Sequence, residues 1–163
     1  MKDKRQTFIE KLYECDQHKK RLLIAKEYLS SVMPLDIERY DTLNEIEMSF
    51  IDQMIYRFSK LQDTMGEKIF SSILEFTGED VKKMTFIDRL NRLEELGLLY
   101  KQEWMKLRKY RNEIAHEYSF NKEEIVDSIN AIFQKVDDLV AIYNDIYNYC
   151  KKQFDFVPSS FNE

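Results

Sequence analysis

The sequence predicts an all-α protein, an up-and-down antiparallel bundle of four to five helices. Only 3 Gly and 2 Pro occur in 163 residues, so few tight turns are available. Leu, Ile, Glu and Lys are plentiful, and apolar residues recur every three or four positions in several long runs. This length suits one hydrophobic core. We therefore expect a single helical domain over residues 1–163, with its core at about 4–150 and an extended C-terminal tail at 151–163.

The first helix is predicted from about Lys4 to Ser31. It ends before Met33-Pro34, because the residue that precedes a proline disfavours the helical conformation. His18 has no partner of catalytic type nearby in the sequence, so we expect it on the surface. The predicted buried positions are Phe8, Leu12, Leu22, Leu23, Ala25 and Leu29.

A long central helix is predicted next. Asp41 or Thr42 is the expected N-cap, and Glu45 would complete a capping box with Thr42. Gly66 is expected to bend or interrupt the helix, and Thr77-Gly78 to end it. The apolar stripe of its first part consists of Leu43, Ile46, Phe50, Ile51, Met54, Ile55, Phe58, Leu61 and Met65.

Two shorter helical segments follow. Thr85 is the predicted cap of a helix from Phe86 to Leu96, which Gly97 closes. The next helix covers residues 104–118. Its Trp104 and Tyr110 have aromatic faces on which nucleic-acid bases can stack, although core packing is the more frequent use of both.

The last helix has the most regular apolar stripe. Asn121 is its predicted cap, and Glu123 and Glu124 lie in the first turn, where the helix dipole favours anions. The stripe consists of Ile125, Ile129, Ile132, Phe133, Val136, Leu139, Val140, Tyr143, Ile146 and Tyr147.

Charge is unevenly distributed along the chain. The formal net charge is -5, which argues against a general polyanion-binding protein. From Lys82 to Arg111, however, basic residues outnumber acidic ones by nine to four. A local basic zone on an acidic body is typical of a small nucleic-acid site. A solvated helix face rich in Lys and Arg is an equally good interpretation of the charge alone.

Several classes of site are not predicted. Cys15 and Cys150 form no CxxC or Cys/His pattern, so we expect reduced thiols and a cytoplasmic protein. With 2 His in the chain and no HExxH, no metal site is predicted, and no cofactor is expected. The chain shows no glycine-rich phosphate loop and no GxSxG motif. No run approaches the roughly 18 apolar residues that span a bilayer, so no membrane association is predicted.

Arg111, Asn112 and His116 fall on one side of the predicted helix. A neutral imidazole can take a proton from a ribose 2′-hydroxyl, and an arginine fork fits the charge that develops on phosphorus. A symmetric dimer would supply the second acid that the leaving 5′-oxygen needs. In the alternative interpretation, Arg111 pairs with a core carboxylate, for which Asp63 is the candidate, and His116 is a half-buried structural residue.

These residues resemble a known motif. Arg111, four residues, His116, one residue and Tyr118 match the RX4HXY motif of HEPN-domain ribonuclease toxins of the HepT type, with Asn112 as the polar residue after the arginine. Residues 56–66 resemble the central helix of that family, and residues 107–112 its approach to the motif. The resemblance covers roughly residues 40–150.

The resemblance implies a HEPN-like helical bundle that dimerises through the motif helix and cuts RNA without a metal ion. It also implies a nucleotidyltransferase antitoxin that silences the toxin by AMPylation of Tyr118, although a core aromatic is the alternative interpretation of that residue. The candidate RNA-contact residues are Arg57, Lys60, Arg108 and Lys109.

Two other functions remain open from the sequence. One is a non-catalytic helical partner that binds a nucleotide or substrate for an associated nucleotidyltransferase. The other is a plain helical interaction module in which Arg111 is tied to Asp63.

Overall fold

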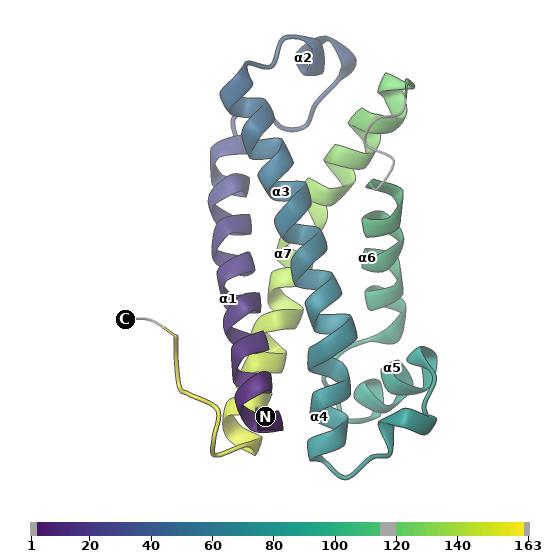
Figure 1. The fold of residues 1–163 in the computed structure, drawn as a ribbon. Coiled ribbons are helices and arrows are strands. Elements are labelled where there is room, and N and C mark those ends of the chain that lie inside the picture. Colours follow the sequence, from purple (N-terminus) through teal and green to yellow (C-terminus); the bar gives the residue numbers. More distant parts are fainter. Residues whose placement is uncertain (1–2, 115–119, 162–163) are drawn as a thin grey trace.

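The computed structural model describes residues 3–114 and 120–161, in which every regular element is a helix. The all-α prediction is therefore confirmed. The four long helices are α1 (Lys4–Leu29), α3 (Glu45–Thr64), α6 (Lys101–Ile114) and α7 (Lys122–Gln153). Figure 1 shows them running alternately up and down, so that the bundle is antiparallel in chain order.

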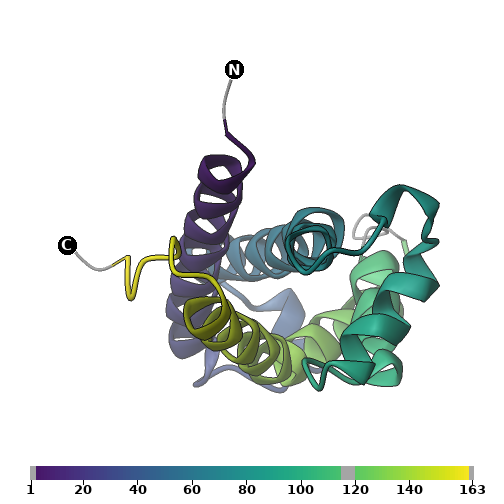
Figure 2. The same ribbon diagram turned by 90° about the horizontal axis from the view of Figure 1, so that it is seen from below.

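Shorter elements connect these helices. They are α2 (Ile37–Asp41), a π-helical turn (Met65–Ile69), α4 (Phe70–Phe76), a 3-10 turn (Val81–Lys83) and α5 (Phe86–Glu95). Seen along the bundle axis, α5 and α6 stand on the side of α3 and α7 away from α1 (Figure 2). α1 packs mainly against α3, whereas α6 packs against α7 and α3. The groove between α3 and α6 is therefore separated from α1.

The predicted apolar stripes form one continuous core. Burial of these side chains is the main driving force for folding. Two predicted core positions are wrong: Leu23 is 36% exposed and Ile46 is 69% exposed. Each lies at the edge of its stripe, where helical spacing alone does not fix which side faces the neighbouring helix.

Gly66 lies inside the π-helical turn that joins α3 to α4. The sequence predicted a bend or an interruption there, and the structure has an interruption: one wider π-helical turn separates α3 from α4. A β-carbon on Gly66 would lie 3.3 Å from Cζ2 of Trp104, which is a tight contact. The glycine thus lets the indole of α6 approach the backbone of the central helix.

The start of the central helix differs from the prediction. Asn44, and not Asp41 or Thr42, is the N-cap: it accepts from the backbone N–H of Glu47 at 2.8 Å, and Glu47 accepts from that of Asn44 at 2.9 Å. Thr42 instead ends α2, a helix that the sequence pattern did not predict. Thr42 with Glu45 and Asn44 with Glu47 both have the spacing of a capping box, and only the second pair forms one.

Replacing Asn44 with alanine is expected to lower the free energy of unfolding by about 1 kcal/mol, because the side chain satisfies an N–H at the helix end. Thr42→Ala is the matched control, since its hydroxyl bonds only to a carbonyl of the preceding short helix. Urea denaturation of both variants measures the difference. Equal losses would contradict the assignment of Asn44 as the cap.

Other predicted helix ends are confirmed. Thr85 caps α5 by accepting from the N–H of Asp88, and Asn121 caps α7 by accepting from those of Glu123 and Glu124. Gly78 and Gly97 follow α4 and α5 with φ of 94° and 77°, values that glycine adopts without a steric cost.

The C-terminal segment differs from the extended tail predicted at 151–163. Helix α7 continues to Gln153, and Phe154 and Val157 are then buried. The ring of Phe8 lies 5.4 Å from that of Phe76 and 6.2 Å from that of Phe154, measured between centroids. Phe156 lies 5.3 Å from Phe76. The segment therefore packs on the start of α1 and the end of α4.

Candidate functional site

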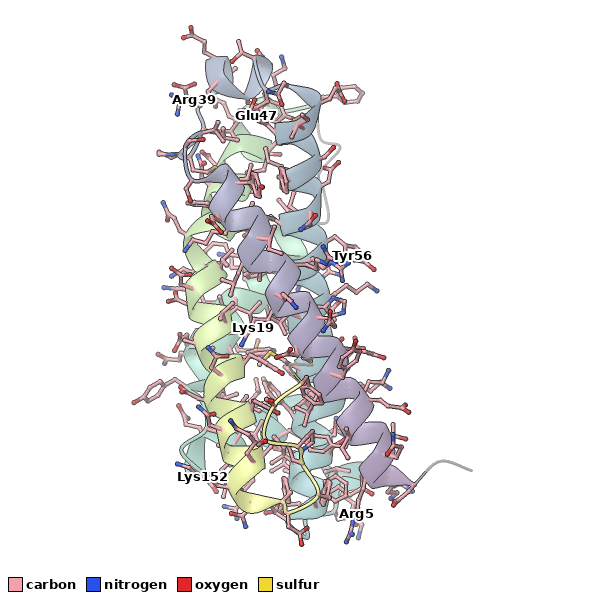
Figure 3. The ribbon with its side chains drawn as sticks, turned by 90° about the vertical axis from the view of Figure 1, so that its left-hand side faces the viewer. Arg5, Lys19, Arg39, Glu47, Tyr56 and Lys152 are labelled. Atoms are coloured by element: carbon pink, nitrogen blue, oxygen red, sulfur yellow. The ribbon has the colours of Figure 1, made fainter. Side chains whose placement is uncertain are left out.

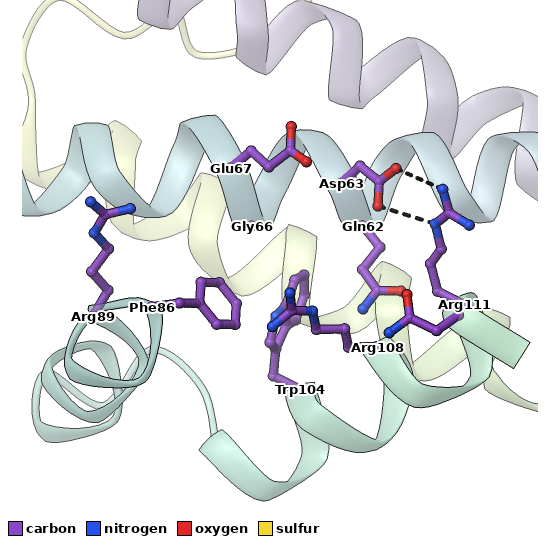
Figure 4. Close-up of a pocket in the computed structure, with 10 residues that line it drawn as sticks. Gln62, Asp63, Gly66, Glu67, Phe86, Arg89, Trp104, Arg108 and Arg111 are labelled. Atoms are coloured by element: carbon purple, nitrogen blue, oxygen red, sulfur yellow. Dashed lines mark hydrogen bonds and ion pairs between the residues drawn. The ribbon is translucent and has the colours of Figure 1, made fainter. Parts of the chain in front are cut away.

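A cleft of about 500 Å³ opens between the central helix on one side and α5 and α6 on the other. Figure 4 shows the side chains that line it. Arg108, Arg111 and Asn112 come from α6, so the structure brings three predicted site residues to one cavity. The other lining residues are Gln62, Asp63, Gly66, Glu67, Phe86, Arg89 and Trp104.

Arg111 forms a two-point ion pair with Asp63. Its Nε donates to Oδ1 at 3.2 Å and its Nη2 to Oδ2 at 3.1 Å. The pairing named in the alternative interpretation is thus present (Figure 4). The pair is not sealed in the core, because the side chains of Arg111 and Asp63 are 28% and 37% exposed.

Asp63 engages only one edge of the Arg111 guanidinium. An arginine has five N–H groups, and the two that meet Asp63 are on the Nε side. Within residues 3–114 and 120–161, Nη1 donates to no acceptor. The second fork, which suits two oxygens of a phosphate, therefore remains available in the described part of the chain.

Gln62 joins the two walls at the base of the cleft. It is 3% exposed. In the amide orientation that satisfies both partners, its nitrogen donates to the Leu107 carbonyl at 3.2 Å and its oxygen accepts from the Arg108 N–H at 2.8 Å. These two hydrogen bonds fix how far α6 is shifted along the axis of α3. They therefore also fix the position of Arg111 opposite Asp63.

Trp104 forms the floor of the cleft and is 1% exposed. Its ring packs edge-on against Phe70, with centroids 4.7 Å apart. Trp104 is therefore used for core packing, and its covered ring offers no face for base stacking. Its Nε1 has no hydrogen-bond partner among the described residues, and so the indole contributes apolar packing at the cost of one unsatisfied donor.

Three arginines and two carboxylates set the charge of the cleft. The Arg108 guanidinium carbon lies 4.5 Å from the centre of the Phe86 ring, a cation–π contact. Arg89 donates to the Val81 carbonyl at 2.9 Å. Phe86 and Arg89 of α5 were not predicted as site residues, since α5 had no signal beyond its amphipathic spacing and the basic zone around it. Glu67, in the π-helical turn of the central helix, was not predicted either.

The predicted contact residues Arg57 and Lys60 do not line the cleft. Arg57 faces α1, where its Nη1 lies 3.0 Å from Nδ1 of His18. Lys60 is exposed on α3, three residues before Asp63 and next to it on the helix surface. Its ammonium lies 5.7 Å from the centre of the Tyr56 ring.

His18 is half-buried, which corrects the expectation of a surface residue without a partner. Burial, followed by the charge of Arg57, lowers the pKa of His18 below its usual value. The neutral ring can accept from Arg57 through Nδ1. This histidine therefore has a structural role between α1 and α3.

The outer face of α6 carries a second hollow of about 400 Å³, lined by Met105, Arg108, Lys109, Asn112 and Glu113. The Lys109 ammonium lies 3.9 Å from Glu113. Arg108 and Asn112 border both hollows. The predicted contact residue Lys109 thus lies beside the cleft. Tyr110 is packed partly against the core.

The predicted residues His116 and Tyr118 lie outside the described residues. Helix α6 is described up to Ile114, two positions before His116.

Both cysteine thiols are buried and reduced. Burial raises the pKa of Cys15 and that of Cys150, the latter to about 12, so neither thiol ionises readily to a nucleophile. Among the described residues, no three His, Cys, Asp or Glu side chains gather in a way that could hold a metal ion. In the same part of the chain, no helix has the length and apolar character that crossing a membrane requires.

No protein-family model matches the chain, and no curated protein or solved structure shows significant similarity to it. The function of the protein must therefore be inferred from its own residues and their arrangement.

Proposed function

We propose that this protein is a HEPN-like endoribonuclease toxin that cuts RNA without a metal ion and acts as a homodimer. The observation that carries the proposal is the second fork of Arg111, in an open cleft that Asn112 and Arg108 also line. In the sequence, His116 and Tyr118 of the RX4HXY motif follow two and four positions after Ile114, the last described residue of α6. A helical bundle with a basic cleft next to the motif is compatible with the fold of that family.

In the proposed reaction, His116 removes the proton of a ribose 2′-hydroxyl. The 2′-oxygen then attacks the neighbouring phosphorus and the bond to the 5′-oxygen breaks, which leaves a 2′,3′-cyclic phosphate and a 5′-hydroxyl end. Arg111 stabilises the additional negative charge on the phosphate oxygens, and Asn112 orients the imidazole or a phosphate oxygen. The second subunit's histidine donates the proton to the leaving oxygen.

Asp63 holds Arg111 in one orientation through the ion pair on the Nε side. A guanidinium that is already oriented loses less entropy when it binds a phosphate. The nearby carboxylate also repels the phosphate, which weakens ground-state binding. Under this proposal, Asp63 is a positioning residue.

Regulation follows from the motif as well. AMPylation of Tyr118 by a partner nucleotidyltransferase would add a phosphate close to Arg111, and this phosphate would compete with RNA for the same donors. The protein is then the toxin of a two-component pair and should harm cells when it is expressed without its partner.

A comparison of the two histidines tests the nuclease. RNA cleavage is measured in buffer containing EDTA for the wild type, His116→Ala and His18→Ala. We expect His116→Ala to lose about 100-fold or more in rate, because general base catalysis is worth at least that factor. His18→Ala should cut at close to the wild-type rate, since His18 bonds to Arg57 away from the cleft. Equal rates for His116→Ala and wild type would remove the proposed base.

The Arg111–Asp63 pair also favours a second function, a non-catalytic partner that binds a nucleotide for a nucleotidyltransferase. Under that function, the carboxylate permanently offsets part of the charge that catalysis would need. Expression of the protein without its partner distinguishes the nuclease from the binding subunit. A binding subunit should leave cell growth unchanged and RNA intact.

A further inference from the structure

A further hollow lies on the opposite side of the bundle, between α1, α7 and the C-terminal segment. Its volume is about 540 Å³, within the range of sites for small molecules. Figure 3 shows the C-terminal segment passing in front of α1 and α7, with Lys19 nearby. Residues far apart in the sequence thus form the walls of one cavity.

The charges around this hollow favour an anion. Lys19 and Lys20 of α1 and Lys151 of α7 line it, and Asp16 is the only acidic residue among the described residues of the lining. Within residues 3–114 and 120–161, none of the three lysines forms an ion pair with a carboxylate. The hollow therefore carries three ammonium groups against one carboxylate, a net positive charge in the described part of the chain.

Two of the ammonium groups are already positioned. Nζ of Lys19 donates to Oδ1 of Asn144 at 2.9 Å and lies 5.5 Å from the centre of the Tyr143 ring. Nζ of Lys151 lies 4.9 Å from the centre of the Tyr147 ring. An ammonium has three N–H groups, so Lys19 retains two for a ligand. Both side chains are half-buried, which lowers the entropic cost of ordering them.

The C-terminal segment completes the site. The Tyr147 hydroxyl donates to the Pro158 carbonyl at 2.6 Å, and the rings of Tyr147 and Phe161 are near-parallel at 5.6 Å. These contacts place Ser159 and Ser160 in the lining. Hydroxyl and ammonium donors together match the oxygens of a phosphate group.

We propose that this hollow binds a small phosphorylated metabolite, with Lys19, Lys20 and Lys151 contacting its phosphate and Ser159 and Ser160 donating further hydrogen bonds. The site is separate from the cleft of Arg111, because the two share no lining residue among those described. Its occupancy does not depend on whether the protein cuts RNA.

The test uses inorganic pyrophosphate as the probe and isothermal titration calorimetry of the full chain at about 150 mM salt, where non-specific attraction is screened. Wild type is compared with Lys151→Ala and with Lys152→Ala. Lys152 is the matched control: it is adjacent in sequence and exposed, and it does not line the hollow. We expect saturable binding that Lys151→Ala weakens about tenfold, the effect of losing one charge-assisted hydrogen bond, while Lys152→Ala leaves it unchanged.

A second comparison guards against misfolding and against binding elsewhere. Lys20→Ala removes an exposed side chain that cannot disturb the core, and it should also weaken pyrophosphate binding. Arg108→Ala shows separately whether pyrophosphate binds in the other cleft, which Arg108 lines. The proposal is overturned if wild type shows no saturable binding, or if the Lys151 and Lys152 variants bind alike. It is also overturned if only Arg108→Ala loses binding.

Discussion

Arg111→Ala is expected to lower the rate of RNA cleavage by about 100- to 1,000-fold, the usual effect of removing one donor from a developing oxyanion. The thermal unfolding temperature should change little, because the side chain is 28% exposed and its partner, Asp63, is 37% exposed. Arg111→Lys should also be strongly impaired, since an ammonium has no second fork for the phosphate. Single-turnover cleavage of a labelled RNA measures both variants.

Lys109→Ala is the matched control for charge. Lys109 lies two residues away on the same helix and contacts Glu113, and its removal should change the rate by only a few-fold. Cleavage at the wild-type rate by Arg111→Ala would rule out the catalytic assignment.

Asp63→Asn distinguishes the nuclease from the plain interaction module. If the ion pair only holds the fold together, the variant should lose several kcal/mol of stability, as expected when a buried charge loses its partner. The observed exposure of both side chains instead predicts a loss below about 1 kcal/mol. A chemical denaturation curve separates these outcomes.

Trp104→Ala is expected to lower the free energy of unfolding by about 3–5 kcal/mol, the range for deleting a large buried ring. The side chain is 1% exposed and packs on Phe70 and Gly66. Trp104→Phe should cost clearly less, because it retains most of the packing and removes an indole N–H without a partner in the described residues.

The control for this prediction is Tyr100→Ala, which removes an aromatic ring that is 69% exposed just before the same helix. Its effect should stay within about 0.5 kcal/mol. Guanidinium denaturation followed by circular dichroism measures all three variants. A loss below about 1 kcal/mol for Trp104→Ala would show that the cleft floor is not part of the cooperative core.

The helices and their caps could be predicted because helix formation and capping depend on residues that are close together in the sequence. Asn121 and Thr85 cap the helices for which they were predicted, since each satisfies N–H groups two or three residues away. The same rule failed at Thr42, because the pair Asn44 and Glu47 has the same spacing as the pair Thr42 and Glu45, and Thr42 instead ends α2. Helix α2 is short and lacks a buried residue, so it had no periodic signal.

The site was harder to predict because it is built across helices. Helical spacing placed Arg111 on the inner side and identified Asp63 as a candidate partner, and the structure confirms this contact. No pattern within α5 indicated that Arg89 and Phe86 would face the same cleft. Helical spacing placed Trp104 among the apolar positions of its helix, but its close approach to Gly66, 38 positions earlier in the chain, depends on a missing β-carbon and could not be inferred from α6 alone.

The aromatic contacts of Phe8 with Phe76 and Phe154 join the first turns of α1 to the segment that follows α7. Terminal segments of a bundle usually fray independently, each at little cost in free energy. Here, local unfolding of either segment removes an aromatic ring against which the other segment packs. The first turns of α1 and the segment after α7 are therefore expected to open together, and a substitution of Phe8 or Phe154 should destabilise both.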